Sequence, residues 1–216
     1  MSEKLQGEQW LNSHAKRQFD ICVSSSLLPL VTPIAILGAL AFSIESGNKP
    51  LFIQERIGKS DTALRILKLR TMPFNYDLSD ASKGYSDERA NKIGRFLRKT
   101  TIDESPQIAQ VLAGRMSIVG PRPLIASDVE RTLDVLSSRE RGEWLAARSI
   151  ATPGLLSDFG NMSRDLVPQS DEYLAARAAA DIEYHSTASA ATDRRIIKDA
   201  LRIGLGVAQL ERKTVF

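Results

Sequence analysis

The chain has few residues of the types that form disulfides or bind metals through sulfur or imidazole. Cys22 is its only cysteine, so an intramolecular disulfide and a cysteine-based zinc site are both excluded. His14 and His185 are its only histidines, which excludes a histidine-rich metal centre and leaves a Ser-His hydrolase only two candidate bases. Carboxylate oxygens remain as metal ligands, and these suit a hard cation.

Internal repeats and low-complexity segments are also absent. The 216 residues suffice for one domain with a core of its own, with or without an appendage. Hydrophobic residues make up 43% and charged residues 25%, which excludes a disordered chain and a polytopic membrane protein. The net charge of +3 favours anionic partners such as phospholipid headgroups, nucleotides or nucleic acid, without choosing between them.

One long stretch, from Ile21 to Ile44, carries no charge and exceeds the roughly 20 residues that a membrane-inserted helix needs. It is too long for the apolar part of a secretory signal. Pro29 and Pro33 remove backbone donors within it, and the Thr32 hydroxyl can bond a carbonyl that Pro33 frees. Basic residues, which favour the cytoplasmic side, flank it at both ends: Lys16, Arg17, Lys49, Arg56 and Lys59. We therefore expect a re-entrant helix that bends at Pro33 and returns to the same face. A spanning helix and a kinked helix buried in a soluble core are the alternatives.

The rest of the chain predicts a mostly helical α+β fold. We divide it into an N-terminal segment with the membrane helix, residues 1–46, and a cytosol-facing catalytic domain, residues 47–216. Short apolar runs at 51–53 and 64–69 predict a small β-hairpin. Residues 72–88 are polar and aperiodic, and predict a loop. Apolar spacing and caps predict helices at 91–99, 106–113, 127–147 (one helix or a pair divided near Ser137), 170–184 and 193–210. The last of these is basic and amphipathic, and suits either an anionic membrane surface or a packed core.

The segment from Thr100 to Gln107 carries the most chemistry for its length. It places two adjacent carboxylates, Asp103 and Glu104, after a basic helix, and a rigid Gly-Pro-Arg-Pro segment with Arg122 follows soon after. Carboxylates bind hard cations through oxygen, and arginines meet phosphate oxygens as bidentate donors. The grouping therefore indicates a site for a metal ion and phosphates. The alternative is that the two acids only begin a helix, where negative charge is favoured.

Further charged residues suit the same chemistry. Lys68 and Arg70 lie on one face at the end of the predicted hairpin, where they either meet phosphate or solvate the exposed face. Arg98 ends the basic helix, and Arg164 lies in a predicted loop as a candidate phosphate ligand. Asp181 lies near the end of the predicted helix at 170–184.

In order, these segments resemble the bacterial sugar transferases, the small monotopic phosphoglycosyl transferases. The segments that carry the resemblance are Lys16-Arg-Gln-Phe-Asp20, Thr32-Pro33, Gln54-Glu-Arg-Ile-Gly58, Lys68-Leu-Arg-Thr-Met72, the stretch 97–107 and the stretch 114–124. The match is specific from Lys16 to Leu124 and weak from Pro153 to Asp181. The chain departs from the family at Arg115, where Asp is usual, and in the segments 153–157 and 160–164.

The resemblance implies an activity and a site. Such enzymes move a sugar-1-phosphate from a UDP-sugar to undecaprenyl phosphate and release UMP, as the first membrane step of polysaccharide or glycoconjugate synthesis. Asp103 would be the nucleophile that becomes a covalent phosphosugar, and Glu104 would complete the dyad. Lys68, Arg98 and Arg122 match phosphate-contacting positions. We assign Arg70, Arg164 and Asp181 to substrate binding as well.

The same resemblance implies the surroundings. Mg²⁺ is the expected cofactor, with Asp103 as a ligand. The expected location is the bacterial inner membrane, with a monotopic anchor and the catalytic domain on the cytoplasmic face. Expected partners are the UDP-sugar, undecaprenyl phosphate and membrane lipids, without nucleic acid, because no basic-aromatic pattern or known binding motif occurs. Homo-oligomer formation, the sugar and the pathway stay open.

The altered segments after Pro153 motivate an alternative function. In it, the chain keeps the fold as a catalytically altered, membrane-docked assembly module. Such a module would bind magnesium or nucleotide without turning over any sugar donor.

Overall fold

The computed structural model describes residues 3–72, 90–162 and 166–204, and this part of the chain is mostly helical with two small sheets. The predicted mostly helical α+β fold is therefore confirmed. The predicted loop at 72–88, except Met72, lies outside the described residues, as do Arg164 and residues 205–210 of the last predicted helix. The division at residue 46 stays a prediction.

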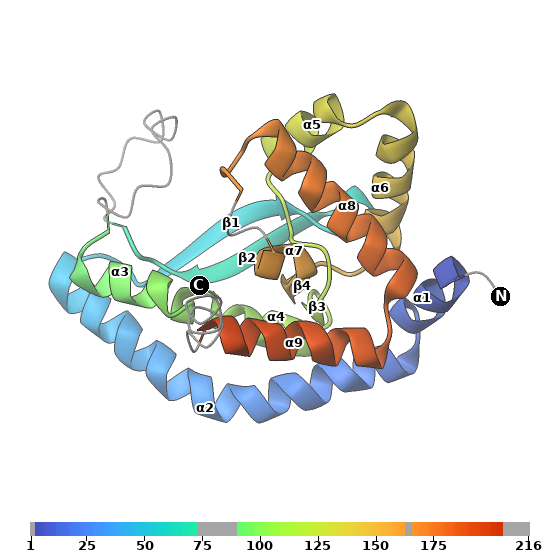
Figure 1. Ribbon diagram of the computed structural model, residues 1–216. Helices are drawn as coiled ribbons and strands as arrows, with labels where there is room; N and C mark the ends of the chain where they lie inside the picture. The colour runs from blue at the N-terminus through green and yellow to red at the C-terminus, as the bar shows by residue number, and fades with distance from the viewer. Residues whose placement is uncertain (1–2, 73–89, 163–165, 205–216) are drawn as a thin grey trace, which may run out of the picture.

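The long apolar stretch lies in α2 (His14–Ser46), which follows a short helix, α1 (Glu3–Leu11). The Ser13 side chain caps α2 by accepting a hydrogen bond from the Lys16 amide, and Gly47 ends it at a φ of 67°. The helix is continuous through Pro29 and Pro33, and it is bowed along its length in Figure 1. A bend located at Pro33 therefore stays a prediction, and the side chains of both Thr32 and Pro33 are exposed.

Within the described residues, α2 is the one helix long and apolar enough to cross a membrane, and only 6% of its apolar window is buried. Its two ends nevertheless pack on the rest of the protein. At its start, Lys16 and Asp20 are buried, and near its end Phe42 packs against Leu69 and Leu97. The exposed apolar side chains lie between these contacts and at the end of the helix: Ile21, Leu30, Ile34, Ile36, Leu37, Leu40 and Ile44.

The predicted hairpin is confirmed as the antiparallel pair β1 (Leu51–Ile57) and β2 (Ala63–Leu69), joined by the 3-10 turn η1 (Lys59–Asp61). Two alternate residues of β2, Leu64 and Ile66, are buried, as the period of a strand requires. In Figure 1 the hairpin crosses the molecule between α2 and the group formed by α5, α6 and α8.

Two predicted helices follow, α3 (Lys92–Lys99) and α4 (Gln107–Leu112), separated by the 3-10 turn η4 (Ile102–Glu104). Asn91 caps α3 by accepting from the Gly94 amide. Gly114 follows α4 with a φ of 77°, which a glycine adopts without strain.

A parallel pair of short strands, β3 (Ser117–Val119) and β4 (Gly154–Leu156), was not predicted from the sequence. Their pairing joins segments far apart in sequence, which leaves no local periodicity to detect. It also needs two glycines in close contact: a Cβ atom on Gly154 would lie 2.1 Å from the Gly120 nitrogen. The crossover between the strands is the helix pair α5 (Ala126–Val135) and α6 (Ser138–Ile150).

The predicted interruption near Ser137 is confirmed, since Ser137 caps α6 in a capping box with Glu140. The chain continues through α7 (Asp158–Met162), α8 (Asp171–Thr187) and α9 (Ala190–Gly204). Helices α5 and α6 pack against α8, while α9 packs on α7 and both short strands.

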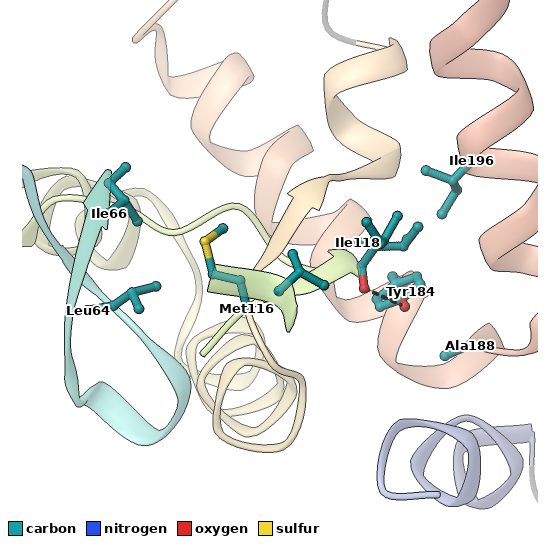
Figure 2. Close-up of a cluster of buried hydrophobic side chains, with 9 residues drawn as sticks. Leu64, Ile66, Met116, Ile118, Tyr184, Ala188 and Ile196 are labelled. Carbon is teal, nitrogen blue, oxygen red and sulfur yellow. Dashed lines mark hydrogen bonds between the residues drawn. The ribbon is translucent and has the colours of Figure 1, made fainter. Parts of the chain in front are cut away.

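The main core joins the hairpin, helix α4, the two short strands and helices α8 and α9. Figure 2 shows Leu64 and Ile66 of β2, Met116 and Ile118 at β3, and Ile196 of α9 in one buried cluster. The cluster fixes the hairpin against β3, and thereby fixes the segments that flank both.

Candidate active site

Glu104 is the centre of a charged cluster. Its Oε1 atom accepts hydrogen bonds from Lys68 Nζ at 2.6 Å and from Arg122 Nη2 at 3.0 Å. The Glu104 and Lys68 side chains are largely buried, whereas the side chain of Arg122 is 48% exposed. Two cations therefore share one carboxylate oxygen at the edge of the protein, where an anionic substrate can reach Arg122.

The fold brings these residues together from three separate segments. Lys68 lies near the end of β2, and Glu104 lies in η4, which contacts β2. Arg122 lies between two prolines after β3, and this turn is tied to the hairpin by a 2.7 Å bond from the Ile57 amide to the Leu124 carbonyl. The Arg122 carbonyl also accepts from Arg148 Nη1 at 3.2 Å. The backbone on both sides of the cluster is thus held in place.

The turn that carries the two acids is locally strained. Thr101 has a φ of 55°, in the left-handed region that a β-branched residue rarely adopts. Such backbone costs on the order of 1–3 kcal/mol and persists where the surrounding structure imposes it. Here it directs the chain from α3 into η4, so that Asp103 and Glu104 lie beside Lys68.

The two adjacent carboxyl groups have opposite pKa shifts. Burial raises the pKa of Asp103, the charge of Glu104 raises it further, and Lys68 and Arg98 act against both. Burial acts on Glu104 in the same direction, but Arg122 and Lys68 outweigh it and lower the pKa of Glu104. Glu104 therefore stays ionised to lower pH, while Asp103 is the more basic carboxylate, which favours it as the nucleophile.

Replacing Glu104 by Gln should move the acid limb of the pH–rate profile to lower pH. As the expected nucleophile, Asp103 would attack only as a carboxylate, so kcat/KM should fall as the pH drops through its pKa. The amide removes the negative neighbour that raises this pKa and leaves the charge of Lys68 facing Asp103. Lys68→Met should shift the limb the other way, because Lys68 lowers the pKa of Asp103. The measurement is kcat/KM for UMP release from acid to neutral pH, and equal midpoints in all three proteins would contradict the assignment.

The other proposed site residues lie in different places. Arg98 is close enough to Asp103 to lower its pKa. Arg70 turns away from the cluster: its Nε donates to the Lys49 carbonyl at 3.1 Å, and its guanidinium lies 5.5 Å from the centre of the Phe52 ring. Arg164 lies outside the described residues.

Asp181 is buried in α8 and is not brought to the cluster. Its Oδ2 accepts from Trp144 Nε1 at 2.9 Å and from Arg148 Nη1 at 3.3 Å. Arg148 also donates to the Arg122 carbonyl, so hydrogen bonds connect Asp181 to the backbone of the segment that carries Arg122. The sequence did not reveal this, because only the fold shows that the Asp181 carboxylate is occupied.

A small recess next to Glu104 is lined by further residues that were not predicted to belong to the site. They include the side chain of Gln107 and the Gly154-Leu155 segment of β4, along with Arg56, Ile66 and Pro123. Gln107 ends the segment that carries the two acids, but a single sequence cannot distinguish a substrate-binding glutamine from an ordinary buried one. The departure at Arg115 lies elsewhere: its side chain is exposed and is not part of the recess.

The cluster by itself offers few ligands for Mg²⁺. Among the described residues, no group of three or more His, Cys, Asp or Glu side chains could hold a metal ion. Asp103 offers one carboxylate, whereas Glu104 is engaged by two cations. Mg²⁺ is often held by one or two carboxylates with waters and substrate phosphates, so the site fits this ion only with the substrate present.

Comparison with known proteins identifies the family. Residues 11–206 match the sequence model of the family described as "Bacterial sugar transferase", and the chain belongs to this family.

Among the similar proteins is a UDP-glucose:undecaprenyl-phosphate glucose-1-phosphate transferase of Caulobacter vibrioides, 37% identical over 183 residues, which are 84% of this chain and 66% of that protein. An undecaprenyl-phosphate glucose phosphotransferase of Komagataeibacter xylinus is 35% identical over 84% of this chain and 34% of its own length. The exopolysaccharide production protein PSS of Rhizobium leguminosarum bv. phaseoli is 41% identical over 50% of this chain and 54% of its own. The chain thus spans between about a third and two thirds of these relatives.

Proposed function

We propose that the chain is a phosphoglycosyl transferase that moves a sugar-1-phosphate from a UDP-sugar to undecaprenyl phosphate. The observation that carries this proposal is the pairing of a basic carboxylate, Asp103, with a neighbouring carboxylate clamped by Lys68 and Arg122. The names of the similar transferases support the same donor and acceptor classes.

The proposed reaction has two displacements at one phosphorus atom. An Asp103 oxygen forms a bond to the β-phosphorus of the donor, the bond to the bridging oxygen breaks, and UMP leaves with the electron pair. An oxygen of the lipid phosphate then attacks the same phosphorus and releases the Asp103 carboxylate. Covalent catalysis by a carboxylate divides one difficult transfer into two easier steps.

The charges of the cluster suit this chemistry. The nucleophile and both substrates are anionic, so attack requires that their repulsion be cancelled. Arg122 is exposed and can meet a phosphate, while Lys68 lies beside both acids. Mg²⁺, held by Asp103 and the substrate phosphates, would add Lewis-acid polarisation of phosphoryl oxygens.

The arrangement of α2 supports a protein that lies on one side of the membrane and does not cross it. A helix that crosses a bilayer has its ends on opposite sides, whereas both ends of α2 pack on the same protein body. The exposed apolar residues between those ends would enter the cytoplasmic leaflet of the inner membrane. In that arrangement the cluster would lie near the headgroup layer, which also holds the lipid phosphate.

Cysteine labelling tests this topology. Single cysteines introduced at Ser2 and at Asn48, in a Cys22→Ser background, should both react from the cytoplasmic side of sealed inverted vesicles. A spanning helix would expose the two positions on opposite sides, and that labelling pattern would overturn the re-entrant arrangement. Intact right-side-out vesicles provide the matched control.

The activity itself is tested by UMP release. Purified protein in detergent, with magnesium, undecaprenyl phosphate and a panel of UDP-sugars, should release UMP with at least one donor and form the corresponding lipid-linked product. The alternative, a catalytically altered assembly module, is favoured by the changed segments after Pro153 and predicts UDP binding without turnover on any donor of the panel.

A further inference from the structure

Helix α4 buries two glutamines, three residues apart, whose amide groups differ in their hydrogen bonding. Gln110 is fully engaged with β2: its Nε2 donates to the Arg65 carbonyl at 2.7 Å, and its Oε1 accepts from the Leu67 amide at 2.9 Å. Gln107 is only 3% exposed, and its Nε2 has no hydrogen-bond partner among the residues that the structure describes. One glutamine thus holds the hairpin, and the other buries a donor that the fold does not use.

A buried donor without an acceptor destabilises the folded protein, and folded proteins contain few of them. An apolar side chain of similar shape at position 107 would avoid this loss. The contacts of the described residues therefore give no structural reason for a glutamine at position 107. An acceptor from outside the chain would satisfy it.

The surroundings of Gln107 indicate the chemistry of that acceptor. Gln107 lines the recess that also contains Lys68, Glu104 and Arg122. The free volume of this recess is about 10 Å³, enough for one oxygen-sized group and not for a sugar or a base. Arg56 also lines the recess, so three basic side chains face one acid around this small space. That excess of positive charge, together with the Gln107 side chain, favours a single anionic oxygen, with the remainder of the ligand outside.

We propose that the Gln107 amide is a substrate-binding group that donates a hydrogen bond to a phosphoryl oxygen seated in this recess. The proposal rests on the proposed transferase function and adds a neutral, oriented donor to the cationic cluster. The oxygen can come from the diphosphate of the UDP-sugar or from the lipid phosphate. A trapped water molecule is the competing occupant.

The experiment compares Gln107→Met with Gln110→Met in the full-length chain. Methionine has nearly the volume of glutamine and lacks polar hydrogens. Gln107→Met should leave the melting temperature unchanged or higher, because it removes an unsatisfied donor. Gln110→Met should lower the melting temperature, because it leaves two backbone groups of β2 unpaired. A fall for Gln107→Met as large as that for Gln110→Met would show a structural role and overturn the proposal.

Binding is then measured with two probes, UDP with magnesium and a short-chain polyprenyl phosphate in micelles. Gln107→Met should weaken one of them by roughly ten- to a hundredfold, the range for a hydrogen bond to a charged group. Weaker UDP binding assigns the oxygen to the donor, and weaker lipid binding assigns it to the acceptor. Unchanged affinity for both would leave only a bound water and overturn the proposal.

Gln107→Glu extends the test by replacing the donor with an acceptor and a negative charge. It should bind the affected probe more weakly than Gln107→Met does, and equal affinities would contradict a donated hydrogen bond. Because these readouts are binding and melting temperature, they are separate from turnover. Wild-type protein that releases no UMP but shows this pattern would overturn the transferase function and leave the phosphate contact standing.

Discussion

Replacing Asp103 by Asn should abolish UMP release, lowering turnover by on the order of 10³- to 10⁶-fold, as loss of a covalent nucleophile does. The amide keeps the shape of the side chain but cannot attack phosphorus. Burial and Glu104 disfavour the charged carboxylate, so the variant should melt at the same temperature or higher. The measurement is the initial rate of UMP release at saturating donor and acceptor.

A second measurement tests the covalent step itself. Wild-type protein incubated with donor and without lipid should gain the mass of one phosphosugar, and the Asp103→Asn variant should gain none. Asp134→Asn is the matched control, because Asp134 is exposed on α5 and far along the chain from the cluster. Full UMP release by the Asp103→Asn variant would remove the proposed nucleophile.

Replacing Asp193 by Ala should lower the free energy of unfolding by about 3–5 kcal/mol, the cost of breaking a buried ion pair from one side. Asp193 is completely buried in α9. It accepts hydrogen bonds from Lys16 Nζ at 2.8 Å, Tyr184 Oη at 2.8 Å and Trp10 Nε1 at 3.2 Å. Its loss leaves Lys16, near the start of α2, with Asp20 as its one charged partner among the described residues. Denaturant unfolding in detergent measures the effect.

The matched control for this prediction lies on the same helix. Asp199→Ala removes a partly exposed acid that pairs with the exposed Arg195 at 3.7 Å, and its effect should stay within about 0.5 kcal/mol. A loss below about 1 kcal/mol for Asp193→Ala would contradict the importance of this ion cluster.

Much of the local structure could be predicted because its causes lie within a few residues of one another. The helices at 91–99 and 106–113 follow from apolar spacing, and the break at Ser137 follows from a capping box. The hairpin likewise needs only neighbouring strands. The parallel pairing of β3 with β4 escaped prediction, because it depends on Gly120 and Gly154 meeting across a long crossover.

The segment from Thr100 to Gln107 by itself indicated the candidate residues of the site. Asp103 and Glu104 are adjacent in the chain, so their proximity needs no fold, and basic segments on either side marked Lys68, Arg98 and Arg122 as candidates. Their catalytic roles remain predictions. The sequence could not say which of several cations would reach the acids.

That choice was made by the tertiary structure. Packing of the hairpin against β3 brings Lys68 and Arg122 to one oxygen of Glu104. Arg70 instead donates a hydrogen bond to the Lys49 carbonyl. The Asp181 carboxylate accepts hydrogen bonds from Trp144 and Arg148. The same packing leaves Gln107 Nε2 without an acceptor among the described residues, whereas the amide of Gln110 bonds to β2. Residue type and spacing determine which groups a chain can offer, but whether each is occupied depends on neighbours that are distant in sequence.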